Sequence, residues 1–325
     1  MTHFLQHTHK YAYCLFALLL CLSACQKERF SLPLQALVTP TDAPLYDLHF
    51  THPDTGYAVG GQQFFHGEWL YTTDAGTTWQ SDTFTVTALL DIEFLDHQTA
   101  FTAGYTGHAY YKPNASTWWQ SFFPPEKETL TAVDFYSPTL GVAVGGKNFA
   151  NGIIYRFNNL NGSTDTVHYP LDYELRDVQF TDQNTVHTVG YGYVGKSTDG
   201  GLTWTARDIG GDFFFALHFP SSQVGYAVGH SGTIIKTTDG GENWIKIRNG
   251  NNVLVSNAPF RDVYFVTENK GFIVGDDGLF WQTDNGGDSW KIIDHTPQVT
   301  FHSIFYTDGV GYITADEGGI YRFEE

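Results

Sequence analysis

The feature that most constrains the fold is a stretch that recurs along the chain, clearest from Gly225 to Trp244. It reads Gly-Tyr-Ala-Val-Gly-His-Ser-Gly-Thr-Ile-Ile-Lys-Thr-Thr-Asp-Gly-Gly-Glu-Asn-Trp. Two short apolar runs are separated by a glycine-bearing turn, and a second turn ends in a tryptophan. This pattern predicts a β-hairpin followed by the start of another strand. A recurring hairpin indicates a repeat architecture, so the number of copies decides the fold.

The copies can be counted by their spacing. In each, an aromatic residue ends an apolar run, a small or aliphatic residue follows about six positions later, and a second small residue stands four positions beyond that. The second small residues are Gly60, Gly104, Gly145, Gly190, Gly229, Gly275 and Ala315. Units of about 40 to 45 residues with about four short strands each are the period of a propeller blade. The sequence therefore predicts an all-β chain, folded as a seven-bladed β-propeller of four-stranded blades.

The two ends of the chain are expected to meet in this ring. The last unit stops at Phe323, at the end of its third strand, and an apolar run from Leu34 to Thr39 precedes the first unit. An open sheet edge is a liability that folded proteins cover. We therefore expect this N-terminal strand to complete the last blade and close the ring.

Four units carry a sharper signature on the turn after the third strand. An aspartate is followed by glycines and then by a tryptophan, as in Asp239-Gly240-Gly241-Glu242-Asn243-Trp244. The aspartate accepts hydrogen bonds from the turn, glycines take positive φ angles, and the tryptophan packs on the blade. These turns resemble the Asp-box of BNR-type repeats, a structural device. The residues expected to build them are Asp74, Trp79, Asp199, Trp204, Asp239, Trp244, Asp284 and Trp290.

The first residues look like a secretory signal. Lys10 precedes an apolar core from about Tyr11 to Leu22, which is too short to span a membrane. Leu22-Ser23-Ala24-Cys25 is similar to a bacterial lipobox, and an ordinary cleaved signal with a chance cysteine is the alternative. We expect a lipoprotein signal peptide over 1–24, a tether over 25–32 lipidated at Cys25, and the propeller over 33–325. Cys14 and Cys21 would leave with the signal, so the mature chain would hold no disulfide.

Charge narrows the range of partners. The chain has a formal net charge of −18, which argues against nucleic acid and against unaided attraction to anionic lipid. We expect a monomer attached to the membrane by its lipid. Gln26-Lys27 lacks an aspartate directly after the cysteine, which favours the outer membrane of a bacterial envelope.

Two aromatic groups are candidate binding surfaces, because departures from an internal repeat can mark functional additions. The second unit replaces the Asp-box with a segment holding Trp118, Trp119, Phe122 and Phe123, which could stack on sugars or anchor a protein. Simple drift of a turn is the alternative. In the fifth unit Phe213 and Phe214 could form an exposed apolar spot, with Phe215 in the core.

Polar residues recur on the first strand of each unit, on the face that would line a central channel. This arrangement could be a cation site, or the groups could be hydrogen-bonded where blades meet around a wet channel. Nothing in the spacing shows convergence on a metal, so no metal and no cofactor is expected. The residues are Asp47, His49, Asp91, Glu93, Asp134, Asp177, Gln179, His218, Asp262, Tyr264 and Ser303.

Little in the sequence points to catalysis. Asp-box propellers include sialidases, which use three arginines and a tyrosine nucleophile, but their arginine-containing opening motif is absent here. There is no His-Glu-x-x-His motif, nucleophile elbow or phosphate loop. A glycosidase would need two suitably spaced carboxylates, which remains the enzymatic alternative. We expect a protein that is not an enzyme.

Across nearly the whole mature chain, repeats of the form Asp-Val-x-Phe, Gly-Tyr-Ala-Val-Gly and Gly-Thr-Ile-Ile-Lys-Thr-Thr-Asp-Gly-Gly-Glu-Asn-Trp resemble those of the photosystem II stability and assembly factor family. The resemblance implies a non-catalytic seven-bladed propeller that holds a membrane-protein intermediate. The family's arginine-rich patch has no evident counterpart, because Arg176 and Arg261 are the only arginines on first strands. We expect a lipid-anchored scaffold for an envelope protein or complex, with a carbohydrate-binding protein or glycosidase as the alternative.

Overall fold

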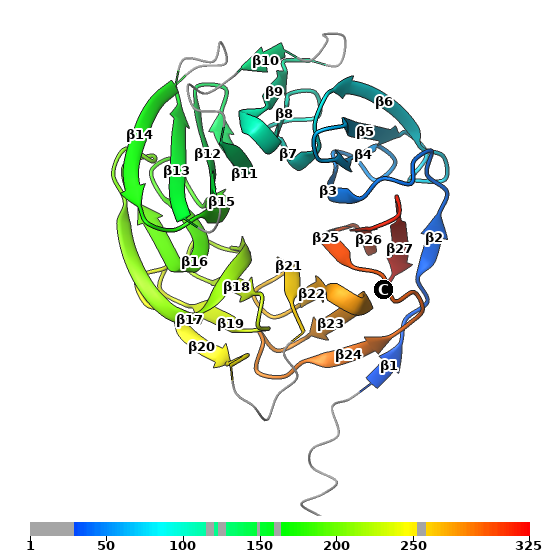
Figure 1. Cartoon of the computed structure of the whole chain (residues 1–325). Coiled ribbons are helices and arrows are strands. Elements are labelled where there is room, and N and C mark those ends of the chain that lie inside the picture. The colour runs from blue at the N-terminus through cyan, green and yellow to red at the C-terminus, as the bar shows by residue number, and fades with distance from the viewer. Residues whose placement is uncertain (1–28, 115–119, 123–127, 148–149, 159–163, 252–257) are drawn as a thin grey trace, which may run out of the picture.

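The fold is an all-β propeller in which sheets stand side by side around a central axis (Figure 1). The computed structural model describes residues 29–114, 120–122, 128–147, 150–158, 164–251 and 258–325. Within these ranges the regular elements are strands and two short 3-10 turns, η1 (Tyr105–Gly107) and η2 (Asp276–Gly278). The alternation of apolar and polar residues with a period of two explains why these segments form half-buried strands.

The first three repeats form one four-stranded antiparallel sheet each, with the earliest strand innermost. The strands are β3 (Leu45–Phe50), β4 (Gly56–Gln62), β5 (His66–Thr72) and β6 (Gln80–Thr85); β7 (Leu89–Phe94), β8 (Ala100–Gly104), β9 (Ala109–Lys112) and β10 (Gln120–Phe122); and β11 (Thr129–Ser137), β12 (Leu140–Lys147), β13 (Ala150–Phe157) and β14 (Thr164–Leu171).

The fourth and fifth repeats share one six-stranded sheet, so the prediction of seven separate four-stranded blades is wrong and the ring has six sheets. The long strand β17 pairs with β16 as far as Phe213 and with β18 from Phe214 onward. Gly210 and Gly211, with φ of 59° and 84°, let it continue from one repeat into the next without a loop. The strands are β15 (Leu175–Phe180), β16 (Val186–Ser197), β17 (Thr205–His218), β18 (Gly225–Gly229), β19 (Ile234–Thr237) and β20 (Ile245–Arg248).

The last two sheets each take up a strand from the N-terminal end of the described chain. β1 (Arg29–Ser31) pairs in parallel with β24, and β2 (Gln35–Leu37) pairs antiparallel with β27. The predicted closure of the ring by an N-terminal strand is therefore confirmed, whereas Arg29–Ser31, expected in the tether, form a strand. The remaining strands are β21 (Phe260–Phe265), β22 (Gly271–Gly275), β23 (Leu279–Thr283), β24 (Lys291–Asp294), β25 (Phe301–Thr307), β26 (Val310–Ala315) and β27 (Ile320–Glu324).

Neighbouring repeats are joined by stacked aromatic rings. In every repeat except the third, where it is Val142, the second residue of the second strand or its equivalent is a ring that stacks on the aromatic residue near the end of the next inner strand. Tyr226 lies 3.6 Å from Phe265 between ring centroids, with an interplanar angle of 4°. Tyr312 of the last repeat lies 3.9 Å from Phe50 of the first. Each such pair stabilises the folded protein by about 0.5–1.5 kcal/mol beyond its buried area. The pair of Tyr312 and Phe50 shows that the first and last repeats are joined by the same contact as repeats that are consecutive in the sequence.

The Asp-box turns have the expected construction, with one correction. Asp239 accepts hydrogen bonds from the backbone and side-chain amides of Asn243, both at 2.8 Å, and these bonds lower the pKa of Asp239 to about 2. In their own turns, Asp74 and Asp199 accept the equivalent bonds from the backbone N–H and the side-chain hydroxyl of Thr78 and Thr203. In the last turn this position is occupied by Asn285, which accepts from the Ser289 amide at 3.0 Å. Asp284, the predicted residue, instead forms a surface ion pair with Lys291.

Candidate functional site

The predicted aromatic platform of the second repeat cannot be placed. Trp118, Trp119 and Phe123 lie outside the described residues, and only the backbone of Phe122 is described, as the end of β10. The remaining candidate sites among the described residues are the channel, the faces and the rim of the ring.

The channel is lined by the inner strands and has a volume of about 440 Å³. Five of the carboxylates that line it, all aspartates, do not point freely into it, because each of these accepts a backbone N–H from the inner strand of the next repeat; Glu93 also lines the channel. We call these five aspartates the channel belt. The bonds run from Ile92 to Asp47 (3.0 Å), Val133 to Asp91 (2.6 Å), Phe180 to Asp134 (2.5 Å), Leu217 to Asp177 (2.7 Å) and Ile304 to Asp262 (2.8 Å).

The belt also closes where the ring closes, because the Ser303 hydroxyl donates to Asp47 at 2.7 Å. Burial raises the pKa of Asp177 to about 8 and those of Asp134 and Asp262 to about 6. In the described part of the chain, no group of three histidine, cysteine or carboxylate side chains has metal-binding geometry. These contacts support the structural interpretation of the channel, in which polar groups join neighbouring repeats.

A second regularity sets up one face of the ring. Every inner strand has a β-bulge near the start of its ladder, directly after a fully buried apolar residue. A bulge leaves one residue out of the ladder and re-aims its side chain. We call the seven residues skipped by these bulges the bulge residues, and the face on which the inner strands begin the bulge face. The bulge residues are Tyr46, Leu90, Thr131, Arg176, Phe215, Arg261 and His302.

Three consecutive bulge residues, Arg176, Phe215 and Arg261, meet in a cavity of about 610 Å³. Tyr191, Phe213 and His230 complete its lining, and we call it the arginine pocket. Phe215 lies between the two guanidinium groups: the Arg261 Cζ is 4.8 Å and the Arg176 Cζ 5.7 Å from its ring centroid. Cation–π contact of this kind holds all three side chains in place.

The pocket reverses the prediction for the phenylalanine triplet. Phe214, expected to be exposed, is fully buried in the core with Val189, Leu217 and Ala227. Phe215, expected in the core, is the bulge residue and lines the pocket. Phe213 is 8% exposed and contributes to the pocket wall. The bulge causes the reversal because one residue drops out of the alternation between the two sides of the strand.

Each arginine of the pocket is paired with a carboxylate of its own repeat. Arg261 Nε and Nη2 donate to the two oxygens of Asp276 at 2.6 and 3.1 Å. Arg176 Nη2 lies 2.9 Å from Glu174 Oε1. Burial lowers the pKa of Arg176, with the Glu174 carboxylate opposing that effect. The pocket therefore combines two neutralised guanidinium groups with an aromatic floor.

A groove continues from this pocket. A second cavity of about 440 Å³ shares Tyr191, Phe213 and His230 with it and extends to Tyr173 and Asp208. Tyr173 and Tyr191, 40% and 48% exposed, stack with centroids 5.9 Å apart. The two cavities together form a continuous depression on the bulge face, lined by aromatic rings together with glycines, arginines and acids, of a size that takes a drug-sized molecule or several residues of a chain.

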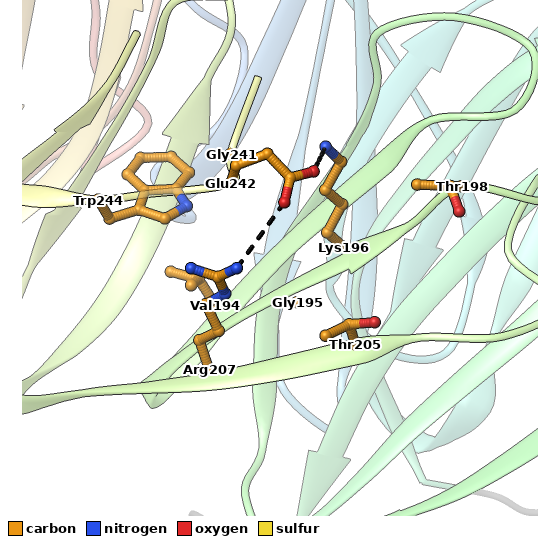
Figure 2. Close-up of a pocket in the computed structure, with 9 residues that line it drawn as sticks. All are labelled: Val194, Gly195, Lys196, Thr198, Thr205, Arg207, Gly241, Glu242 and Trp244. Atoms are coloured by element: carbon orange, nitrogen blue, oxygen red, sulfur yellow. Dashed lines mark hydrogen bonds and ion pairs between the residues drawn. The ribbon is translucent and has the colours of Figure 1, made fainter. Parts of the chain in front are cut away.

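A smaller pocket at the rim has a structural explanation (Figure 2). Its volume is about 80 Å³, room for two or three waters. Glu242, from an Asp-box turn, lies 2.5 Å from Lys196 Nζ and 3.7 Å from Arg207 Nη2, and both cations belong to the preceding repeat. One carboxylate thus satisfies two cations and links neighbouring repeats, which leaves little for a ligand to bind.

The arginine pocket has a signal in the sequence, which appears when the repeats are aligned with one another. The bulge residue directly follows a buried apolar residue in every repeat, and in most repeats it precedes a polar residue of the channel, as in Leu175-Arg176-Asp177 and Phe260-Arg261-Asp262. Aligning the repeats on that position brings Arg176, Phe215 and Arg261 to equivalent places in three consecutive units. The two arginines, isolated in the linear sequence, are therefore neighbours around the ring.

Comparisons with known proteins confirm the resemblance noted from the repeats. A model of the photosynthesis system II assembly factor YCF48 family matches residues 158–256. A solved structure of YCF48 bound to D1 peptide has a TM-score of 0.74 at 16% identity, covering 92% of this chain and 97% of that one. YCF48 from Cyanidioschyzon merolae follows with a TM-score of 0.69 at 16% identity, covering 90% and 98%.

Propellers of other kinds are also similar in fold. The WD40 β-propeller domain of Doa1 has a TM-score of 0.68 at 11% identity, covering 90% of this chain and 95% of that one. Among curated proteins, none matches this sequence significantly. Within the described residues, no helix is long and apolar enough to cross a membrane.

Proposed function

We propose that this protein is a non-catalytic scaffold that binds a segment of a partner protein on its bulge face, in the arginine pocket and the groove that continues it. The observation that carries the proposal is the convergence of three consecutive bulge residues, Arg176, Phe215 and Arg261, on one aromatic cavity of about 610 Å³. Aromatic and arginine side chains in a concave site are the residues that dominate protein–protein binding energy.

The comparisons support the same class of function. A propeller with the same fold has been solved with a peptide bound. The five channel-belt aspartates, which a hydrolase in the channel could use, are occupied by backbone amides, as in the bond from Leu217 to Asp177. A group that already stabilises a contact between repeats is poorly placed to act as a general acid or base.

We further propose that the scaffold acts in a bacterial cell envelope, tethered through a lipid on Cys25. The lipobox-like Leu22-Ser23-Ala24-Cys25 supports this, as does the position of β1, which begins four residues after the cysteine at the outer edge of a sheet. Mass spectrometry of the mature N-terminus tests it. A diacylglycerol-modified Cys25 is expected, and an unmodified N-terminus at another residue would overturn it.

The partner is tested by affinity purification of the protein from gently solubilised native membranes, with co-purifying proteins quantified. A partner recovered near one to one from the wild type is expected to be lost with Phe215→Ala. Arg207→Met, at the rim pocket of Figure 2, is the matched control and is expected to retain it. If wild type and both variants recover the same proteins in equal amounts, the bulge face is not the binding surface.

A carbohydrate-binding function is the second candidate, and one observation favours it. The exposed pair Tyr173 and Tyr191 stands beside Asp208 in the continuing groove, an aromatic shelf next to a carboxylate that could stack on a sugar ring. A glycan array separates the two functions: specific glycan binding that is lost with Tyr173→Ala would favour this candidate.

A further inference from the structure

We propose that the arginine pocket takes an uncharged, apolar stretch of peptide, whose main-chain carbonyl oxygens accept hydrogen bonds from Arg176 and Arg261. The inference rests on the proposed scaffold function and names the chemistry of its ligand. Two arginines alone would favour an acidic partner, but the surroundings of Arg176 and Arg261 do not.

The charge balance of the pocket argues against an acidic ligand. Glu174 and Asp276 place one negative charge beside each guanidinium group, at 2.9 and 2.6 Å. The side chains of both acids are largely buried, 8% and 24% exposed, so solvent screens these pairs less than it would at the surface. A ligand carboxylate would meet a pair of neutralised cations on a chain with a net charge of −18, and would gain little from them.

The geometry of the donors fits carbonyl oxygens. Arg261 uses Nε and Nη2 for Asp276, so its Nη1 has no acceptor among the described residues. Arg176 uses Nη2 for Glu174, and its Nη1 likewise has no acceptor among the described residues, whereas its Nε is enclosed by protein. The Nη1 groups of the two arginines are therefore the donors left for a ligand, and a neutral acceptor satisfies them without bringing a new charge into the pocket.

The rest of the lining fits apolar side chains. The Phe215 ring packs against both guanidinium groups and against Phe213, whose ring centroid is 5.0 Å away, and Phe213 and Tyr191 form the adjoining wall with centroids 5.6 Å apart. Burial of one aliphatic or aromatic side chain against such a surface contributes about 1.5–3 kcal/mol. A cavity of about 610 Å³ holds two or three such side chains, which sets the length of the recognised stretch at a few residues.

The test selects ligands without assuming a sequence. A random peptide display library is panned against the full-length protein, and enriched peptides are synthesised with acetylated N-termini and amidated C-termini. We expect apolar runs without enrichment of Asp or Glu. Because no charge is matched, Kd should change by less than about threefold between about 50 and 500 mM NaCl. Phe215→Ala and Arg261→Lys should each weaken binding about tenfold or more.

Two controls keep the result interpretable. Arg261→Lys keeps the ion pair with Asp276 but loses the planar fork, so its fold should persist if Phe215→Ala alone proves unstable. Arg207→Lys at the rim pocket should leave binding unchanged. Melting temperatures of all variants show whether any lost binding reflects unfolding.

The outcomes separate this inference from the proposed function. Enrichment of acidic residues, dependence on a free terminal carboxylate, or a steep loss of affinity with salt would overturn the charge argument. If the selected peptides bind equally well to all variants, the arginine pocket is not the binding site, and the protein remains a scaffold that binds peptides at another surface. A library that yields no binder to the folded wild type would overturn the pocket and the scaffold function together.

Discussion

At the scale of single residues, a shift of one position along the chain decides whether a side chain supports the fold or faces a ligand. Phe214 is completely buried, and Phe215, the next residue, lies in the arginine pocket. Likewise, Leu175 is buried in the core and Arg176, the next residue, lines the pocket, because a bulge follows the buried residue in each inner strand. Adjacent positions are therefore expected to respond very differently to the same substitution.

Phe214→Ala should lower the free energy of unfolding by about 3–5 kcal/mol, because it opens a cavity in the core. Phe215→Ala should lower it by about 1 kcal/mol, since its ring is partly exposed. Urea denaturation followed by tryptophan fluorescence measures both. Equal losses in the two variants would contradict the assignment of Phe215 to the bulge.

The last Asp-box turn offers a second comparison between neighbours. Asn285→Ala removes the acceptor of the Ser289 amide and the side-chain bonds of Asn285 to Ser289 and Thr283. It should destabilise by about 1–2 kcal/mol. Asp284→Ala removes a surface ion pair with Lys291 and a long side-chain hydrogen bond from Gln282, and should stay within about 0.5 kcal/mol of the wild type. Chemical denaturation of the two variants side by side decides which residue builds the turn.

The features that recur in every repeat could be predicted from the sequence, whereas the contacts made between repeats could not. The hairpin spacing gave the propeller, and the Asp-box motif gave three turns correctly. Asn285 was missed although it stands five residues before its tryptophan, as Asp74, Asp199 and Asp239 do. The arginine pocket was missed because strict alternation cannot register a bulge, and because residues of different repeats become neighbours only when the ring forms.

At the scale of elements, the two N-terminal strands form the outer edges of the last two sheets and so connect them. β2 pairs with β27 and places Leu37 against the core of the first repeat, where Leu45 and Tyr312 lie. β1 pairs with β24, while Leu32 enters the core formed by the last two repeats. The closure by β2 could be predicted from the missing outer strand, but β1 could not, since a parallel strand of three residues leaves no pattern in the sequence.

Removing both strands should be more damaging than removing one. A chain that starts at residue 40 loses the burial of Leu32 and Leu37 and should be destabilised by about 3 kcal/mol or more. It also exposes the edge of β27, so it should dimerise or aggregate. A chain that starts at residue 33 keeps β2 and should remain a monomer. Thermal melting and size-exclusion chromatography test both; equal behaviour of the two would argue against closure by β2.

At the scale of the whole molecule, the channel belt ties all repeats to a common response to pH. Burial holds the pKa of Asp177 at about 8 and those of Asp134 and Asp262 at about 6, above the ordinary value near 4. At a pH between the ordinary value near 4 and the raised pKa of each aspartate, the folded chain keeps a proton that the unfolded chain has released. Folding is then favoured less as pH rises, in the direction opposite to that of most carboxylates.

The free energy of unfolding should therefore fall as pH rises from about 4 to about 8. Each aspartate that keeps its proton only when folded contributes a slope of about 1.4 kcal/mol per pH unit. Below about pH 4 stability should fall again, because turn carboxylates such as Asp239 have lowered pKa values and lose their bonds when protonated. Denaturation at several pH values measures the curve. Asp177→Asn should flatten it between pH 6 and 8, and an unchanged slope would contradict the assignment.

The bulge on each inner strand also bears on how such a chain can change over generations. A bulge residue makes no ladder pair, whereas the residues before and after it fix the core and the channel. Thr131 is an exception, because its buried hydroxyl donates to the carbonyls of Val144 and Leu175. Mutations at the other bulge positions are expected to alter recognition while costing the fold little, and duplication of a repeat would supply another position of the same kind. The ring can be understood as a fixed frame with replaceable contacts, so that descendants of one ancestor could acquire new ligands through a handful of point mutations.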